Sequence, residues 1–384
     1  MSDWAKLAVK RPVGLKHTGP DLQLGRNNIV KELDDLSLFG HVDTDDMLGR
    51  VAELPRQCRD AWARAISLEL PADDRPIRDI VILGIGGSAI GGDLLRTLVA
   101  SECPVPIAVN RDYTLPAFVG PETLAIISSY SGNTEETLVT SELARQAGAR
   151  LVAFTTGGQV AARSSEWGVP LFRHAYRSQP RAALGYSLIP LLGLLVQLGL
   201  VADKAADVEE AIAVMDAWQT EIRETVPFAR NAAKQLAARL HEHLPVVYGS
   251  GYLSEVARRW KGQFNENAKQ WGVFEQMPEL NHNAVVGYDW PADLADKVIV
   301  VILRSSLDHP RNQVRFDVTA EILAQKGIAS ETVHARGERP LAQMLSAIHF
   351  GDYVSYYLAM LNRANPTPVE TIAYLKGRLA EADV

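Results

Sequence analysis

The chain has 384 residues, 47% of them hydrophobic, which suffices for about two domains with a buried core. Its formal net charge of −7 and 22% charged residues argue against nucleic acid or an anionic membrane as a partner. Cys58 and Cys103 form neither a disulfide framework nor a zinc motif, so we expect a reducing, cytoplasmic location and no metal site.

Residues 1–75 have the pattern of a helical, polar N-terminal segment. Its clearest amphipathic stretch is "DDMLGRVAELPRQCRDAWARAISLEL", and the opening "MSDWAKLAVKRPVGLKHTG" lacks an apolar run of signal-peptide length. Because the segment carries no evident chemistry, we assign it to packing or dimerisation.

From residue 79 onward, short apolar runs alternate with helical patterns. Such alternation predicts a parallel sheet with right-handed crossovers. The runs are "DIVILGIGGSAIGGDLLRTL", "VPIAVNRD", "TLAIISSYSGNTEETLVTSELARQAG" and "RLVAFTTGG". The most apolar run, residues 188–201, has about fourteen residues and contains Pro190, whereas a membrane span needs about 20. We therefore predict a buried helix there and no membrane segment.

The second half of the chain repeats this plan. Strand, glycine turn and helix recur in "PVVYGSGYLSEVARRWKGQF", and strand, serine turn and helix recur in "DKVIVVILRSSLDHPRNQVRFDVTAEILAQKG". We therefore predict an α/β protein with two subdomains, residues 76–205 and 206–384, the second including Ala-rich linking helices. Each should be a mostly parallel sheet flanked by helices in three layers, with ligands at the carboxyl ends of the strands.

Two turns carry candidate chemistry. In "GIGGSAIGG", Ala89 stands where the dinucleotide fingerprint ends in glycine or alanine, but no ribose-binding acid follows the next strand, so no nucleotide cofactor is predicted. A tight strand–helix turn explains these glycines equally well. In "SSYSGNTEET", Ser129, Ser131 and Thr134 precede a helix, and hydroxyls with helix N-terminal amides suit a phosphate monoester. Helix capping would explain only one of the three hydroxyls.

At these residues the chain resembles the SIS (sugar isomerase) domain, whose known members bind phosphosugars. "GIGGSAIGGDLL", "SSYSGNTEET", "QPRAALGYSL", "NENAK" and "PELNHN" follow one another as in the bifunctional phosphoglucose/phosphomannose isomerase family of the phosphoglucose isomerase superfamily. The resemblance covers about residues 75–384. It implies two SIS-type subdomains and an aldose–ketose isomerase that uses no cofactor.

The resemblance also implies roles for particular residues. Arg181 stabilises charge on the substrate oxygens and Glu266 moves the proton between C1 and C2. His282 assists ring opening from the other subunit of a homodimer. Lys376 lies near the sugar ring. The residues implied in holding the phosphate are Gly87, Ser88, Ser129, Ser131 and Thr134, and either Thr367 or Thr371 is the residue linked to accepting the mannose epimer.

The chemistry of residues 265–283, "NENAKQWGVFEQMPELNHN", agrees with these roles. Isomerisation needs a base, a stabiliser of the enediolate and a group that opens the ring, and a positioned carboxylate and imidazole suit the first and last. A neighbouring cation would weaken Glu266 as a base, so we expect Arg181 beside the substrate oxygens rather than bonded to Glu266. No metal is required, and "HEH" at 241–243 reads as surface within a helical run.

Taken singly, each of these residues has a structural explanation as a surface charge or a packed histidine. Together they predict a metal-independent isomerase that interconverts glucose 6-phosphate and mannose 6-phosphate with fructose 6-phosphate. Two alternatives stay open: an amino-sugar phosphate isomerase, and a phosphosugar-binding regulator without catalysis. The absence of a basic DNA-binding face weakens the regulator hypothesis.

Overall fold

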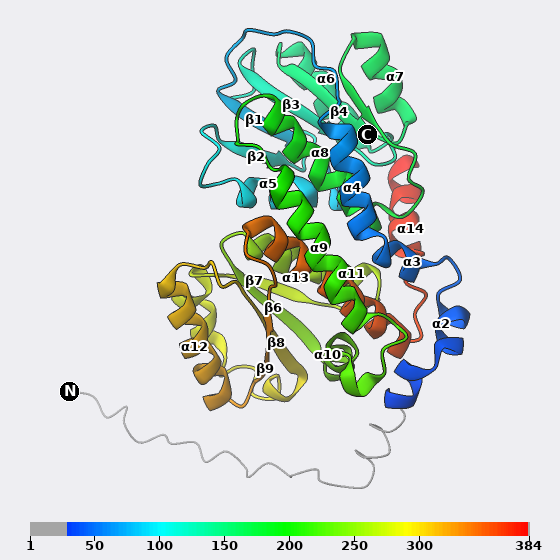
Figure 1. The fold of residues 1–384 in the computed structure, drawn as a ribbon, viewed down its shortest axis with the longest axis vertical. Coiled ribbons are helices and arrows are strands. Elements are labelled where there is room, and N and C mark those ends of the chain that lie inside the picture. The colour runs from blue at the N-terminus through cyan, green and yellow to red at the C-terminus, as the bar shows by residue number, and fades with distance from the viewer. Residues whose placement is uncertain (1–28, 383–384) are drawn as a thin grey trace, which may run out of the picture.

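The computed structural model describes residues 29–382, so the opening stretch of the predicted N-terminal segment lies outside the described residues. The chain forms two α/β halves stacked one on the other, each built on its own parallel sheet (Figure 1). This confirms the predicted fold class. The boundaries drawn at residues 75 and 205 stay predictions.

The first sheet has the strand order β2-β1-β3-β4-β5, with every neighbouring pair parallel. Leu83, the last residue of β1, pairs with Asn110 on β2 and Ile127 on β3, so the turns after β1 and β3 lie at one edge. The strands are β1 (Asp79–Leu83), β2 (Ile107–Asn110), β3 (Thr123–Ser128), β4 (Arg150–Thr155) and β5 (Leu171–Arg173). The sequence analysis missed β5, which has only three residues.

The second sheet has the order β7-β6-β8-β9, which repeats the first four positions of the first sheet. Its strands are β6 (Leu244–Ser250), β7 (Val273–Met277), β8 (Val298–Arg304) and β9 (Ala329–His334). The sequence analysis missed β7, which lies inside the polar stretch 265–283. β7 is an edge strand of mixed exposure, so it lacks the apolar run that marks β6 and β8.

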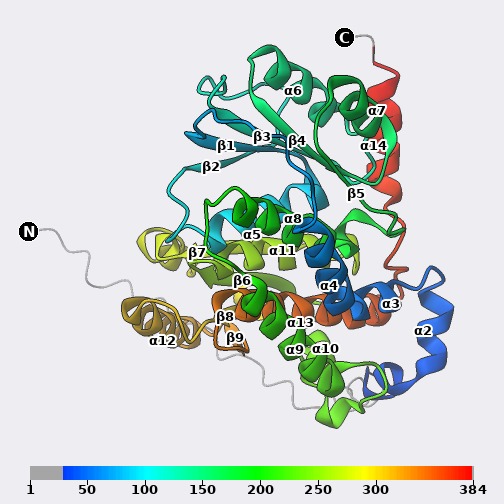
Figure 2. The same ribbon diagram turned by 45° about the horizontal axis from the view of Figure 1, so that its top comes forward.

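Helices cover both faces of each sheet, as the three-layer prediction requires. α6 (Glu135–Gln146) and α7 (Gly158–Trp167) lie on the outer face of the first sheet. α5 (Ile90–Leu98) and α8 (Leu184–Gln197) lie on its inner face (Figure 2). In the second half, α12 (Pro310–Gln325) covers the outer face, and α11 (Leu253–Glu266) and α13 (Pro340–Leu361) cover the inner face.

One hydrophobic core joins the two halves. Alternate strand residues point to opposite faces, so Ile80 and Ile82 face inward while Val81 and Leu83 pack beneath α6 and α7. The inward residues of both sheets share a core with α13, in which every residue from Leu341 to Leu361 is buried. The halves are therefore held by apolar packing rather than by a linker alone.

The remaining helices brace this core. α4 (Leu54–Ala65) packs on α8, and α9 (Ala205–Ile222) and α10 (Ala232–Leu240) pack on α13. The predicted amphipathic helix of residues 45–70 is divided at Glu53 into α3 (Met47–Ala52) and α4, and it ends at Ala65. The other elements are α2 (Leu36–Val42), α14 (Glu370–Ala380) and the short 3-10 turns η1 (Gly86–Ser88), η2 (Pro180–Ala182), η3 (Phe228–Arg230), η4 (Glu279–His282), η5 (Ala284–Gly287) and η6 (Ala295–Lys297).

Residues 188–197 of the apolar run belong to the buried helix α8, as predicted, and the helix ends at Gln197, before the last four residues of the run. Among residues 29–382, no helix combines the length and the hydropathy that crossing a bilayer would need.

Candidate active site

The glycine turn after β1 touches the segment that carries Arg181. Gly86 has a φ of +57°, a conformation that favours glycine. A Cβ on Gly87 would stand 2.8 Å from the backbone nitrogen of Arg181, so only glycine lets η1 and η2 approach this closely. The Ser187 hydroxyl also donates to the Gly87 carbonyl at 3.1 Å, which ties α8 to the turn.

The predicted phosphate hydroxyls lie together around the turn that begins α6. Ser88 Oγ accepts the Tyr130 amide at 2.9 Å, and Ser129 Oγ donates to Thr134 Oγ1 at 3.2 Å. Ser131 is exposed beside them. Thr134 is the N-cap residue of α6, yet its side chain makes no capping hydrogen bond. Capping therefore does not account for the Thr134 hydroxyl.

Arg181 is almost fully buried, with 3% of its surface exposed, and its guanidinium joins the two halves. Nε donates to Asn267 Oδ1 at 2.7 Å, and Nη2 donates to the carbonyls of Pro366 at 2.5 Å and Thr367 at 3.0 Å. Nη1 donates to Glu266 Oε2 at 3.2 Å. Burial lowers the pKa of Arg181, and the Glu266 carboxylate partly offsets that effect.

The Arg181–Glu266 contact corrects the expectation that Arg181 would not bond to Glu266. A buried guanidinium needs an acceptor for each N–H group, because an unpaired donor away from water is costly. Asn267 and the two loop carbonyls accept three of the five N–H groups, and Glu266 accepts a fourth. The pair is therefore a preformed contact between the two halves.

Glu266 is the last residue of α11 and its side chain is 32% exposed. It borders a cavity of about 280 Å³ that Gly87 and Arg181 also line. On its other side is a cavity of about 600 Å³, lined by Lys269, Asn365 and Thr371 among others. Glu266 therefore stands between two spaces, the larger of which adjoins the start of α14.

A buried ion pair between Arg259 and Asp352 stabilises the positions of Arg181 and Glu266. Arg259 donates to Asp352 at 2.8 Å and to the Arg181 carbonyl at 3.0 Å, and Gln263 also donates to Asp352 at 2.8 Å. Arg259 and Gln263 lie on α11, two turns and one turn before Glu266 respectively. This network holds α11, α13 and η2 in a fixed relation, so it orients both Arg181 and Glu266.

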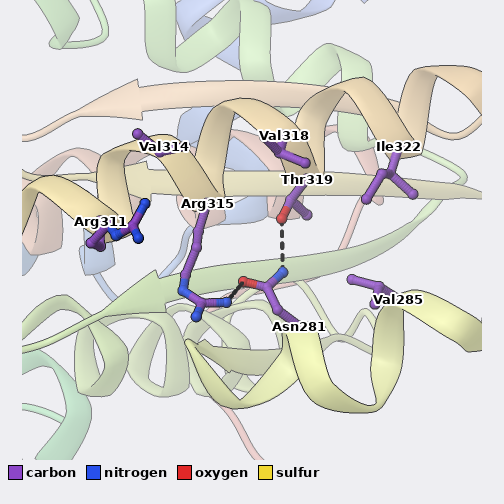
Figure 3. A pocket seen from close by; sticks show the side chains of 8 residues that line it. All are labelled: Asn281, Val285, Arg311, Val314, Arg315, Val318, Thr319 and Ile322. Carbon is purple, nitrogen blue, oxygen red and sulfur yellow. Dashed lines mark hydrogen bonds between the residues drawn. The ribbon is translucent and has the colours of Figure 1, made fainter.

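His282 and Lys376 lie outside both cavities. His282 is exposed on η4, and its neighbour Asn281 is pinned to α12 by bonds to Thr319 at 2.9 Å and Arg315 at 3.3 Å (Figure 3). Lys376 lies on α14, which has no buried residue. Within one chain, Gly87, Arg181 and Glu266 thus line one cavity. Ser88 follows Gly87 directly, but Ser88, Ser129, Ser131 and Thr134, like His282 and Lys376, line neither of the two cavities.

The two candidate threonines differ in their surroundings. Thr371 lines the larger cavity beside Glu266. The Thr367 carbonyl accepts a hydrogen bond from Arg181. The Thr367 hydroxyl is buried and has no hydrogen-bond partner among residues 29–382. An unpaired buried hydroxyl can still make a bond to something that enters the site.

Sequence reasoning missed Asn267 and Lys269, although both lie in the quoted "NENAK". Asn267 is fully buried and links Arg181 to Ser355, and Lys269 donates to the Glu266 carbonyl at 2.6 Å. The clustering of amides there was the available signal. "HEH" follows α10 rather than lying in it, which corrects the helical assignment. In the described part of the chain, no three His, Cys, Asp or Glu side chains are grouped to hold a metal.

Comparison with known proteins identifies the family. Residues 229–379 match the bacterial phospho-glucose isomerase C-terminal SIS domain. The chain is 44% identical over 340 residues to the bifunctional phosphoglucose/phosphomannose isomerase of Caldicellulosiruptor bescii, covering 87% of this chain and 99% of that protein. It is 34% identical over 312 residues to the enzyme of the same name from Aquifex aeolicus, covering 81% and 93%.

The fold gives an independent comparison. A hypothetical protein of Thermus thermophilus superposes with a TM-score of 0.71 at 17% identity, over 95% of this chain and 97% of that one. A likeness at that identity speaks for the fold alone. The sequence relatives carry the assignment, and the chain belongs to the bifunctional phosphoglucose/phosphomannose isomerase family.

Proposed function

We propose that this protein interconverts glucose 6-phosphate and mannose 6-phosphate with fructose 6-phosphate through an enediolate. The observation that carries the proposal is the contact between Arg181 of the first half and Glu266 of the second, beside a cavity also lined by Gly87. A carboxylate and a cation that face one space are the two groups that proton transfer next to a carbonyl requires.

In the proposed reaction, the hydroxyls of Ser88, Ser129, Ser131 and Thr134 hold the phosphate. Glu266 takes the proton from C2 of an aldose, the hydroxyl proton moves from O2 to O1 in the enediolate, and Glu266 returns its proton to C1, which gives the ketose. As charge develops on the substrate oxygen, Nη1 of Arg181 moves its hydrogen bond from the carboxylate to that oxygen. A well-aimed donor of this kind contributes roughly 3–4 kcal/mol to the transition state.

Ring opening is assigned to His282, acting in a homodimer, and Lys376 is proposed to lie near the sugar ring. The exposed position of His282, on a segment anchored to α12, supports a role for it in a neighbouring subunit's site. Lys376 lies on an exposed helix that adjoins the larger cavity through its first turn. In this scheme the proton moves between protein side chains and substrate, so we propose that no metal takes part.

Epimer acceptance is assigned to Thr367 in preference to Thr371. Its buried hydroxyl has no partner among the described residues, and its carbonyl is already fixed by Arg181. A cytoplasmic location is proposed because Cys58 and Cys103 are both free thiols.

The test is proton NMR of the protein with fructose 6-phosphate and a chelator, following both anomeric regions. Formation of both aldose phosphates supports the proposal, and Glu266→Gln should abolish both while leaving phosphosugar binding intact. Activity of the Glu266→Gln variant on either epimer would remove Glu266 as the base. Saturable binding without turnover would favour a regulator, and turnover only of aminated sugars would favour an amino-sugar isomerase.

A second measurement tests the shared site. Mixed subunits of Glu266→Ala and His282→Ala should regain part of the activity if His282 acts in trans. No recovery would mean that each subunit works alone.

A further inference from the structure

Lys269 stands at the end of the Glu266 helix in an unusual backbone conformation. Its φ is +53°, a left-handed value that costs a residue with a Cβ roughly 1–2 kcal/mol. The Gln270 amide donates to the Phe264 carbonyl at 3.0 Å, which closes the end of α11 around Lys269. Asparagine or glycine would adopt this conformation more easily, so a lysine here calls for a reason in its side chain.

The side chain of Lys269 turns back onto the helix end. Its ammonium donates at 2.6 Å to the carbonyl of Glu266, one of the last-turn carbonyls that no helical amide can satisfy. It also lies 3.4 Å from the carbonyl of Pro366, in the loop between α13 and α14. A cation at this end of a helix is favoured by the helix dipole.

The Pro366 carbonyl is also an acceptor for Arg181, at 2.5 Å. Two cations from different halves, Arg181 and Lys269, therefore approach the same loop carbonyl. Both also contact Glu266: Arg181 donates to its carboxylate, and Lys269 donates to its backbone carbonyl. The loop and Glu266 line the same cavity of about 600 Å³. A shift of the loop relative to α11 would thus change the direction of the carboxylate.

We propose that Lys269 is a positioning residue for the isomerase reaction, joining the end of the Glu266 helix to the loop that holds Arg181. The inference rests on the proposed function. Lys269 acts through Glu266 and Arg181, and it is not assigned a contact with the substrate. Removing it should reduce turnover far more than substrate binding.

The charge of Lys269 is sensitive to its surroundings. Burial and, next, the Arg181 guanidinium lower the pKa of Lys269 to about 8, while Glu266 and Glu370 partly oppose this. As pH rises through about 8, the ammonium becomes a neutral amine and its bonds to the two carbonyls weaken. Turnover by the native protein should therefore fall partially over that range, and an arginine at 269 should remove the fall.

The experiment compares Lys269→Met, Lys269→Arg and the native protein on fructose 6-phosphate from about pH 6.5 to about pH 9.5. For Lys269→Met, kcat should fall roughly tenfold to a hundredfold, the range expected for a misdirected catalytic group, with KM within about twofold. Lys269→Arg should recover most of kcat and show no fall near pH 8. Arg363→Met is the matched control, because Arg363 is also a left-handed cation after a helix but pairs with Glu32.

A second readout needs no activity. The amides of Ala364, Asn365, Thr367 and Val369 should exchange with deuterium faster in Lys269→Met than in the native protein or Arg363→Met; the Thr367 amide donates to Asn365. If the native protein did not turn over fructose 6-phosphate, the proposed function would fail and exchange alone would decide whether Lys269 fixes the loop. Unchanged kcat, or a rise in KM without loss of kcat, would overturn the inference, as would unchanged exchange.

Discussion

The turn after β3 and the turn after β8 occupy the same place in the two sheets, but the side chain that precedes the helix N-cap points in opposite directions in the two turns. In the first half, Asn133 precedes the N-cap of α6 and turns outward, accepting the Gln159 amide at 3.0 Å. In the second half, Asp308 precedes the N-cap of α12 and turns inward, accepting from Ser250 at 2.6 Å and from the Ser305 amide at 3.3 Å.

The second turn is thus filled by the protein's own carboxylate. Its serines are occupied as well, since Ser305 and Ser306 both bond to Gln343, at 2.6 and 2.7 Å. In the first turn, the exposed Ser131 hydroxyl accepts the Asn133 amide at 3.2 Å. Glu135 and Glu136 lie in the first helical turn of α6 without a hydrogen bond to that serine turn among the described residues. If the proposed phosphate site is correct, the duplicated fold divides its work by side chains: the first half would hold the anion, and the second contributes the helix that carries Glu266.

Removing the residue that joins the two halves should have the largest effect. Arg181→Met deletes the first half's cation from the site, and kcat should fall about a hundredfold to a thousandfold, the loss typical of a missing oxyanion donor. Steady-state kinetics of Arg181→Met beside Arg177→Met, an exposed arginine in the same loop, would measure this. Full activity of Arg181→Met would mean that the second half supplies the chemistry alone.

The two serine turns should respond differently to the same change. Ser131→Ala removes one hydroxyl from the proposed phosphate site, and KM for fructose 6-phosphate should rise about tenfold, as for one hydrogen bond to a charged group. Ser306→Ala, the change in the filled turn, should leave KM unchanged. Equal rises in both variants would erase the distinction between the turns.

Asp308→Asn should weaken the fold rather than the reaction. The half-buried acid loses charge-assisted bonds from Ser250 and Ser305, so the free energy of unfolding should drop by about 1–3 kcal/mol, measured by urea denaturation. kcat/KM should stay within about twofold of the native value. A stable but inactive Asp308→Asn protein would place the second turn in the active site.

The last comparison concerns the acid stability of the first half, and its effect appears only at low pH. His174 stacks on Tyr186 at 4.5 Å, and burial lowers its pKa to about 4 from an unfolded value of about 6.5. Between those values the unfolded state binds a proton that the folded state excludes, so the stability contributed by neutral His174 is lost as pH falls, by up to about 3 kcal/mol.

His174→Phe should therefore reduce the drop in urea midpoint between about pH 7 and about pH 4.5. His334→Gln, which changes an exposed histidine of the second half, should leave the drop as it is. Identical pH profiles for the native protein and His174→Phe would contradict the assignment.

Much of the fold could be predicted because the buried strands β1, β3, β4, β6 and β8 are apolar runs bounded by glycine or polar turns. β5 and β7 could not, since one is only three residues long and the other is a half-exposed edge strand that needs its neighbours to form. Pairing, rather than local composition, defines such strands.

For the site, the motifs located the groups but not their contacts. Gly87, Arg181 and Glu266 were predicted, and they line one cavity. Gly87 could be located from the turn after β1, whereas Arg181 on η2 and Glu266 at the end of α11 reach it only when the two halves pack together. The direct bond between Arg181 and Glu266 was not foreseen, since it follows from the burial of Arg181, which is a property of the assembled halves. Roles for His282 and Lys376 stay predictions because both are exposed on this chain.

The loop between α13 and α14 has a consequence for how the chain can change in length. Surface loops ordinarily tolerate insertions at little cost. Here the carbonyls of two successive residues, Pro366 and Thr367, bind Arg181 while Lys269 approaches the first of them. One residue inserted before Pro366 would shift the chain, so that different carbonyls face Arg181 and Lys269. The length of this loop is therefore constrained, in the way that the pairing register of a β-strand is constrained.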